Sequence, residues 1–287
     1  MPITIAQACN VTKVRIGFFI ALSALAGAAV TPGAAVSGWT LAALFFSVLL
    51  ASASAGAFNQ YVERQGDRLM PRTCNRPFAT GALPESDLWF VAMAVVLAAA
   101  VALALSALGV VAALHVFLGA FTYGVIYTVW LKRRTWLNIV IGGLAGSFAV
   151  LAGAATVDPA PAAVPLAFAL ALFLWTPPHF WSLAMARRDD YAAAGVPMLP
   201  LVMGDQKAAR IIFWHTAALV AVSLSPAIWG IAWSYLAAAG VGGLYFLWRS
   251  WRLLLAPGPQ TAAANFRASL LQLSLLLAGA YSTVWFG

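Results

Sequence analysis

Charged side chains are scarce in this sequence. Only 8% of its 287 residues are charged, whereas 63% are hydrophobic. Soluble domains carry roughly 25% charged residues, so a soluble protein of this composition would expose large apolar patches to water. A surface that faces lipid needs such a composition, because hydrocarbon cannot solvate polar side chains. The composition therefore excludes water-soluble folds and predicts an integral membrane protein.

Cysteine is also rare, since only Cys9 and Cys74 occur, and their spacing suits neither a metal site nor a redox motif. The net charge of +8 could indicate nucleic-acid binding. The basic residues, however, lie between long apolar runs instead of forming one solvated stripe, so we expect no nucleic-acid partner. The N-terminus resembles neither a cleavable signal nor a transit peptide, and the first apolar run is expected to remain as a membrane helix.

Long apolar runs, in contrast, are plentiful. A helix needs about 20 residues to cross a bilayer. Nine segments come close to that requirement, which predicts an all-α fold: a bundle of nine transmembrane helices in a single domain, residues 1–287. The expected helices are Ile16–Thr31, Val36–Phe58, Leu88–Ala107, Gly109–Val129, Leu137–Ala155, Ala162–Met185, Ile211–Gly230, Ala232–Trp248 and Ala268–Phe286.

All 16 Lys and Arg residues fall at alternate ends of these segments, from Lys13 and Arg15 before the first to Arg249, Arg252 and Arg267 around the last turn. Positive charge marks the cytoplasmic side, so we expect a cytoplasmic N-terminus and an outside C-terminus. Seven of the eight acids share those loops, and only Asp158 does not. The rule for basic residues does not explain the acids. The two long loops that contain them, residues 59–87 and 187–210, are therefore candidate sites of chemistry.

The first acidic loop begins with Asn59, Glu63 and Asp67, which are spaced four residues apart. This spacing places three oxygen ligands on one helical face. Such donors suit Mg²⁺, which takes one or two carboxylates and completes its shell with water and phosphate oxygens. A solvated helix end with Glu–Arg pairs is the other interpretation of the same spacing.

Basic residues follow these acids. Arg72 and Arg76 lie just beyond Asp67, and Lys132 opens a run of three basic residues in another loop. Acids for a metal followed by arginines for oxyanions are the combination that a diphosphate requires. Ordinary anchoring at the cytoplasmic face would also use these basic residues.

A second acidic pair, Asp189 and Asp190, follows the segment Trp175–Trp181, which contains Pro177, Pro178 and His179. The two prolines should kink the helix. If the helix then continues, His179 and Asp190 share a face, and the two acidic clusters could hold two metal ions around one diphosphate. The alternative is a surface pair that balances Arg187 and Arg188. Two further histidines, His115 and His215, are interpreted as neutral groups bonded to neighbouring helices.

Three segments resemble the UbiA superfamily of intramembrane prenyltransferases, and in particular its heme-farnesylating branch. They are NQYVERQGDRLMPRTCNRP at Asn59–Pro77, YTVWLKRRTWLNIVIGG at Tyr127–Gly143 and TPPHFWSLAMARRDDYAAAGVPMLP at Thr176–Pro200. Most members of the superfamily have a second DxxxD motif, but here Ala194 stands four residues after Asp190. Glu63 also stands where many relatives have Asp. Both departures suit the heme branch.

The resemblance implies transfer of a farnesyl group from farnesyl diphosphate to a vinyl group of heme B, with addition of water, to give heme O. It implies Mg²⁺, in two ions, and a bacterial inner-membrane enzyme whose site faces the cytoplasm. It further implies product delivery to heme A synthase or a terminal oxidase. On this basis the expected catalytic residues are Asn59, Glu63, Asp67, Asp190 and His179, the metal ligands are Asn59, Glu63, Asp67, Asp189 and Asp190, and the diphosphate ligands are Arg72, Arg76, Lys132 and Lys207.

Other functions are also open to this sequence. A related enzyme could prenylate an aromatic quinone precursor, although the Pro-Pro-His-Phe-Trp segment argues against it. A transporter would be expected to show an inverted repeat and a polar site near the bilayer midplane. The sequence has no convincing repeat, and its charges lie at one end of the helices. A structural assembly factor would not need the carboxylate row.

Overall fold

The computed structural model describes residues 4–160 and 162–286, and these residues form helices and connecting loops without strands. Most residues of each of the nine predicted segments are helical. The helices are α1 (Ile5–Val11), α2 (Val14–Ala29), α3 (Gly38–Asp67), α4 (Pro77–Thr80), α5 (Leu88–Leu108), α6 (Val110–Phe121), the π-helix η1 (Thr122–Leu131), α7 (Asn138–Gly142), α8 (Leu144–Val157), α9 (Ala163–Ala186), α10 (Arg188–Ala193), α11 (Leu199–Met203), α12 (Asp205–Leu224), the 3₁₀-helix η2 (Ser225–Trp229), α13 (Trp233–Leu255) and α14 (Pro259–Phe286).

Seven helices are long and apolar enough to cross a membrane, and an eighth is obtained if the bent pair α1 and α2 counts as one crossing. The predicted count of nine is not reached by this measure. The remaining candidate for a crossing is α13, which has 23 residues. Its glycines, tryptophans and two arginines make it less apolar than the other long helices. Its length nevertheless corresponds to about 34 Å, enough for the hydrocarbon core.

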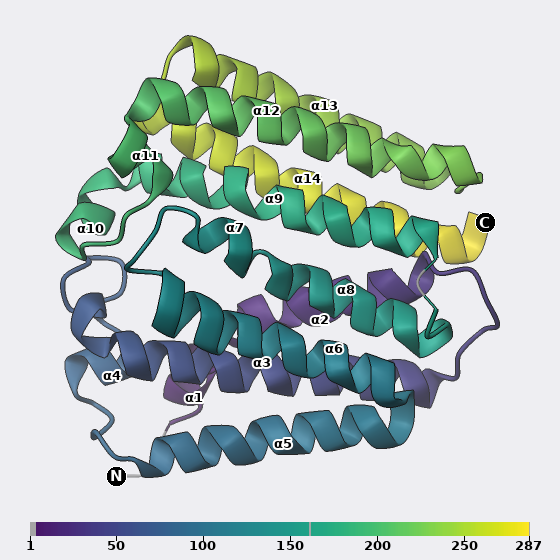
Figure 1. Cartoon of the computed structure of the whole chain (residues 1–287), viewed down its shortest axis with the longest axis horizontal. Coiled ribbons are helices and arrows are strands. Elements are labelled where there is room, and N and C mark those ends of the chain that lie inside the picture. Colours follow the sequence, from purple (N-terminus) through teal and green to yellow (C-terminus); the bar gives the residue numbers. More distant parts are fainter. Residues whose placement is uncertain (1–3, 161, 287) are drawn as a thin grey trace.

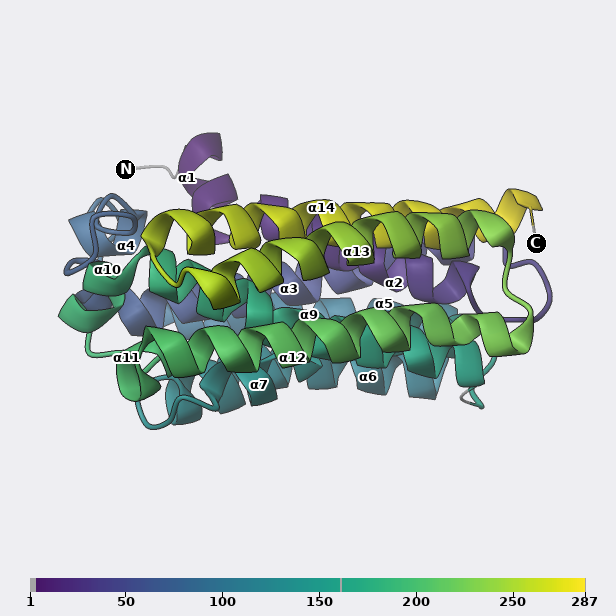
Figure 2. The same cartoon turned by 90° about the horizontal axis from the view of Figure 1, so that it is seen from above.

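The long helices lie side by side along one axis of the molecule (Figure 1). The short helices α4, α10 and α11 gather at one end, and the view from above places them at that same end (Figure 2). The two long acidic loops, residues 59–87 and 187–210, include these short helices, whereas α14 ends at the opposite end of the bundle. The fold thus concentrates the charges that were predicted for one membrane face at one end of the bundle.

Two glycines allow α2 and α8 to cross in backbone contact. A Cβ atom on Gly27 would collide with the carbonyl of Val150, and one on Gly153 would collide with the carbonyl of Ala24. Small residues permit this kind of close approach between membrane helices. The contact closes the bundle in the half away from the charged loops.

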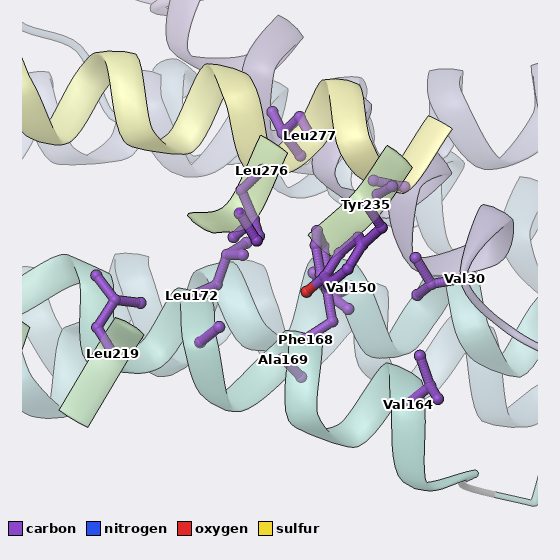
Figure 3. Packing of buried hydrophobic residues seen from close by; sticks show 14 of the residues in the cluster. Val30, Val150, Val164, Phe168, Ala169, Leu172, Leu219, Tyr235, Leu276 and Leu277 are labelled. Atoms are coloured by element: carbon purple, nitrogen blue, oxygen red, sulfur yellow. The ribbon is translucent and has the colours of Figure 1, made fainter. Parts of the chain in front are cut away.

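The C-terminal helices pack around a continuous apolar cluster (Figure 3). Phe168 and Leu172 of α9 meet Leu219 of α12, Tyr235 of α13 and Leu276 of α14 in this cluster. All five are buried. This half of the molecule is therefore a packed core, and the large cavity described below lies in the other half.

Candidate active site

A cavity of about 240 Å³ opens among α2, α3, α6, η1 and α8. Its charged end is lined by Asn59, Glu63, Asp67, Arg76 and Lys132, five of the residues predicted from sequence, and it lies toward the short helices. Its other end is lined by apolar side chains of the same helices. One cavity thus joins a charged region to a hydrocarbon-like region.

The predicted row on α3 is real and buried. Asn59, Glu63 and Asp67 lie in one helix and are exposed by only 2%, 7% and 1%. All three line the cavity. Because the three side chains are buried, they do not form a solvated helix end. A buried carboxylate without a partner would be strongly destabilised, so both acids require partners.

Each member of the row has a cation from a different segment of the chain. Lys132 forms an ion pair with Glu63, and one guanidinium nitrogen of Arg76 donates to both carboxylate oxygens of Asp67 at 3.0 and 2.8 Å. Lys13 donates to the amide oxygen of Asn59 at 2.5 Å. Three cations thus contact the buried oxygens of the row.

Lys13 was predicted only as a topological marker, and its place in the site was missed. It is the one non-glycine residue with positive φ among the described residues, at +50°, where the chain turns by 55° between α1 and α2. This conformation is unusual for a side chain as bulky as lysine. The turn directs its ammonium group to Asn59 and to the hydroxyl of Tyr123, at 2.9 Å.

The π-helix η1 adds an aromatic wall that sequence reasoning also missed. Tyr123 and Tyr127 line the cavity with their rings stacked at 5.6 Å. Thr128 donates to the carbonyl of Tyr123 and accepts from the amide of Asn59 at 2.9 Å. A wide helical turn of this kind often marks a functional site. A hydrophobic period of 3.6 residues does not distinguish a π-helix from an α-helix. The presence of Tyr123 and Tyr127 near the basic loop was the feature of the sequence that could have indicated the aromatic wall.

Two further polar residues lie around the charged end. Arg72 is exposed and lines the cavity from the loop after α3. Tyr191 of α10 is buried, and its burial raises the pKa of the phenol above its ordinary value. It therefore stays a neutral hydrogen-bond donor at physiological pH.

The second acidic cluster is placed differently. Asp189 and Lys207 are exposed and Asp190 is half-buried, and the cavity lining within the described residues includes none of the three. One carboxylate oxygen of Asp190 is buried, and it has no hydrogen-bond partner among the described residues. Asp190 directly precedes Tyr191, which lines the cavity. The acidic pair Asp189 and Asp190 therefore lies beside the site and not within it.

The predicted shared face of His179 and Asp190 is wrong. Helix α9 runs through Pro177 and Pro178 without interruption but ends at Ala186, and Asp190 belongs to the separate helix α10. His179 instead faces α14, where its Nδ1 bonds the Ser269 hydroxyl at 2.7 Å.

The His179 ring is buried between two aromatic side chains. It stacks on Trp175 at 4.2 Å and lies 4.5 Å from Phe266. Thr176 and Phe180, on the adjacent face of α9, line the cavity. The ring itself is not part of the cavity lining within the described residues.

The other two histidines do not bond neighbouring helices as expected. His115 and His215 each use Nδ1 to bond a carbonyl four residues earlier in their own helix, Val111 at 3.1 Å and Ile211 at 3.2 Å. His115 lines the apolar part of the cavity. His215 packs edge-on against Trp181, away from it.

The α3 row fits Mg²⁺ only with the help of a ligand. Within the described residues no three His, Cys, Asp or Glu side chains lie close enough to hold an ion by themselves. Two carboxylates and an amide oxygen are a donor set that Mg²⁺ accepts when phosphate oxygens complete its shell. Four cations on the same lining, Lys13, Arg72, Arg76 and Lys132, would serve those phosphates.

Comparison with solved structures identifies the fold. The chain aligns with a structure described as digeranylgeranylglyceryl phosphate synthase in membranes with a TM-score of 0.78, at 18% identity, covering 96% of this chain and 98% of that one. It also aligns with a UbiA homolog from Archaeoglobus fulgidus bound to GPP and Mg²⁺ with a TM-score of 0.69, at 17% identity, covering 96% and 99%.

Comparison of sequences agrees with the predicted resemblance. The model of the UbiA prenyltransferase family matches residues 20–276. Protoheme IX farnesyltransferase 2 of Paramagnetospirillum magneticum is 57% identical over 268 residues, which is 93% of each chain. Protoheme IX farnesyltransferase 1 of the same organism is 45% identical and covers 97% of this chain and 98% of its own length. This multi-pass membrane protein therefore belongs to the UbiA prenyltransferase family.

Proposed function

We propose that this enzyme transfers a farnesyl group from farnesyl diphosphate to a vinyl group of heme B, producing heme O and diphosphate. The 57% identity over 93% of both chains to a protein named protoheme IX farnesyltransferase carries the choice of acceptor. The cavity supports the choice of donor, because its charged end suits a diphosphate and its apolar end suits an isoprenoid chain.

In the proposed reaction the allylic C–O bond of farnesyl diphosphate breaks, and its electron pair leaves with the diphosphate. The terminal vinyl carbon of heme B bonds to the farnesyl C1. Water adds its hydroxyl to the other vinyl carbon and releases a proton. The product is a hydroxyethylfarnesyl group, and atoms and charge balance without a redox partner.

The chain's own residues would promote the first step electrostatically. Arg72, Arg76, Lys132 and Lys13 would bind diphosphate oxygens, where negative charge grows as the bond breaks. Lys207, which is exposed outside the cavity lining, would act only at the entrance. Tyr123 and Tyr127 of η1 line the cavity, and their rings would stabilise the allylic cation that forms there.

Asn59, Glu63 and Asp67 would hold Mg²⁺, which neutralises diphosphate charge when bound. Binding requires the present ion pairs to exchange partners. Lys132 and Arg76 would release Glu63 and Asp67 and turn to the phosphates. A second ion at Asp189 and Asp190, with Asp190 taking part in catalysis, remains part of the proposal. The partnerless buried oxygen of Asp190 is the observation that supports it.

A role for His179 toward heme also remains a proposal. The ring neighbours the cavity-lining residues Thr176 and Phe180. Contact with a macrocycle would require its stacked neighbours, Trp175 and Phe266, to move.

We further propose that the whole chain is a single domain with nine crossings in the bacterial inner membrane. The N-terminus and the site would face the cytoplasm, where Lys and Arg gather, and α13 would be the ninth crossing. The protein would pass heme O to heme A synthase or a terminal oxidase. Reporter fusions after residue 287 test the topology, since a C-terminal alkaline phosphatase should be active and a C-terminal fluorescent protein should stay dark.

The decisive experiment supplies purified protein in lipid nanodiscs with heme B, farnesyl diphosphate and Mg²⁺. Mass analysis of extracted pigment should show heme O, and chelation of Mg²⁺ should abolish it. Glu63→Gln is the inactive control. An enzyme that prenylates an aromatic quinone precursor, but leaves heme B unchanged, would overturn the proposed acceptor.

A further inference from the structure

The cavity has a definite deep end. The residues on its lining that lie farthest from Lys132 along each helix are Ile20 of α2, Val48 of α3, His115 of α6 and Ala149 of α8. From Asn59 to Val48 the α3 helix advances roughly 16 Å. This length is of the order of an extended chain of three isoprene units.

The bundle is packed tightly beyond that end. Leu44, one turn past Val48 on α3, and Ala113, two residues past His115 on α6, are exposed by 0% and 4%. The backbones of α2 and α8 touch there, at Gly27 and Gly153. The cavity therefore does not continue along the bundle axis. A chain that enters from the charged end stops at the four deep-end residues named above.

His115 differs from the other three in shape and in how it is held. It is the only ring among them, and its Nδ1 is bonded to the carbonyl of Val111. Its ring meets that of Phe148 on α8 at 5.9 Å in an edge contact. A hydrogen bond on one side and an aromatic contact on the other fix the ring in place. A ring held in this way at the deep end of a channel limits the length of the chain that fits.

We propose that His115 determines isoprenoid length by ending the channel after three isoprene units. This inference rests on the proposed function for the identity of the donor. Removal of the ring would open room toward Phe148 for one more unit, and a larger ring would shorten the channel. His115 is in this respect a specificity-determining residue, and it lies about 12 Å of helix rise from Tyr123 at the charged end.

The test compares the use of geranyl, farnesyl and geranylgeranyl diphosphates by wild type and two variants. His115→Ala should raise kcat/KM for the geranylgeranyl donor relative to the farnesyl donor by about tenfold or more, since single methylenes already alter such ratios by about that factor. Ala149→Leu should shift preference toward the geranyl donor. Leu114→Ala is the matched control, because Leu114 is 51% exposed and lies outside the cavity lining within the described residues.

Binding of unreactive thiodiphosphate analogues of the three donors, measured without heme, separates this inference from the proposed function. A wild type that makes no prenylated heme would contradict the proposed function, while its preference among the analogues would still test the channel. The same analogue preference in wild type, His115→Ala and Ala149→Leu would overturn the role of His115. The expected shift in His115→Ala supports it, and if that variant does not fold, a shift of preference toward the geranyl analogue in His115→Trp replaces it as the test.

Discussion

The two halves of the bundle bury polar groups in different ways. Around the cavity, α3 and its neighbours bury charges, which pair across segments of the chain at Lys13, Lys132 and Arg76. Among α9, α12, α13 and α14 the buried polar groups near the charged end are neutral. Ser182, Thr216, Ser250 and Asn265 bond one another there at 2.9–3.0 Å.

The contrast separates function from assembly. Neutral hydroxyls and amides join membrane helices at modest benefit to stability. Buried charges in a membrane are costly and indicate function. We therefore interpret the C-terminal half, with its apolar cluster and neutral network, as a scaffold, and we expect the chemistry in the N-terminal half. His179, with its bond to Ser269, lies on the border between the two.

The largest effect should follow from Asp67→Asn. The substitution keeps the shape but removes the charge that would bind Mg²⁺ and that now pairs with Arg76. We expect heme O formation to fall by about 10²–10³-fold, the usual cost of losing one such electrostatic group. The rate is measured in nanodiscs, and membrane insertion is checked by fractionation. Activity at the wild-type level in an inserted protein would contradict the metal role.

A smaller effect is expected from Lys13→Met, which tests the cation that sequence analysis missed. Loss of one charged hydrogen bond to diphosphate should raise KM for farnesyl diphosphate by about tenfold to a hundredfold. Arg15→Met is the control, since Arg15 is exposed two residues away. An unchanged KM in Lys13→Met would contradict a role in diphosphate binding and leave Lys13 only as a positive charge at the cytoplasmic membrane face.

The scaffold half should respond in the opposite manner. Asn265→Ala removes bonds to Ser182 and Ser250. The free energy of unfolding should drop by about 1–2 kcal/mol, with kcat/KM within about twofold of wild type. Detergent titration of the purified protein measures the first quantity and heme O formation the second. Loss of activity without loss of stability would show that the network acts in catalysis.

The smallest effect is expected from Glu85→Gln. Glu85 pairs with Arg64 at 2.7 Å, and that guanidinium lowers the pKa of the Glu85 carboxyl. Glu85 is exposed to solvent and Arg64 is half-buried, and ion pairs at the surface contribute little to stability. We therefore expect Glu85→Gln to have the melting temperature and activity of wild type. The small difference should not vary between pH 6 and 8, since the Glu85 carboxylate of wild type stays ionised throughout that range. Glu63→Gln provides the contrast, because Glu63 is buried and pairs with the half-buried Lys132.

The sequence revealed the features that follow from local periodicity. The helices, the charged end of the bundle and the row Asn59–Glu63–Asp67 all depend on spacing along one segment, and the family resemblance was confirmed. The partnership of Lys13 with Asn59, 46 residues away, depends on tertiary packing and a left-handed turn. The error with His179 and Asp190 arose because an uninterrupted helix was assumed, whereas the chain leaves the helix at Arg187.

The cations on the cavity lining outnumber the carboxylates by four to two, and the surplus affects the end of the catalytic cycle. If the proposed function is right, Lys13, Arg72, Arg76 and Lys132 would bind inorganic diphosphate through the same contacts that they offer to the substrate headgroup. We therefore expect release of that product to be slow relative to bond breaking, as in many enzymes whose chemistry is fast. Inorganic diphosphate should compete with farnesyl diphosphate for this site, and a cell that hydrolyses it would draw the reaction forward.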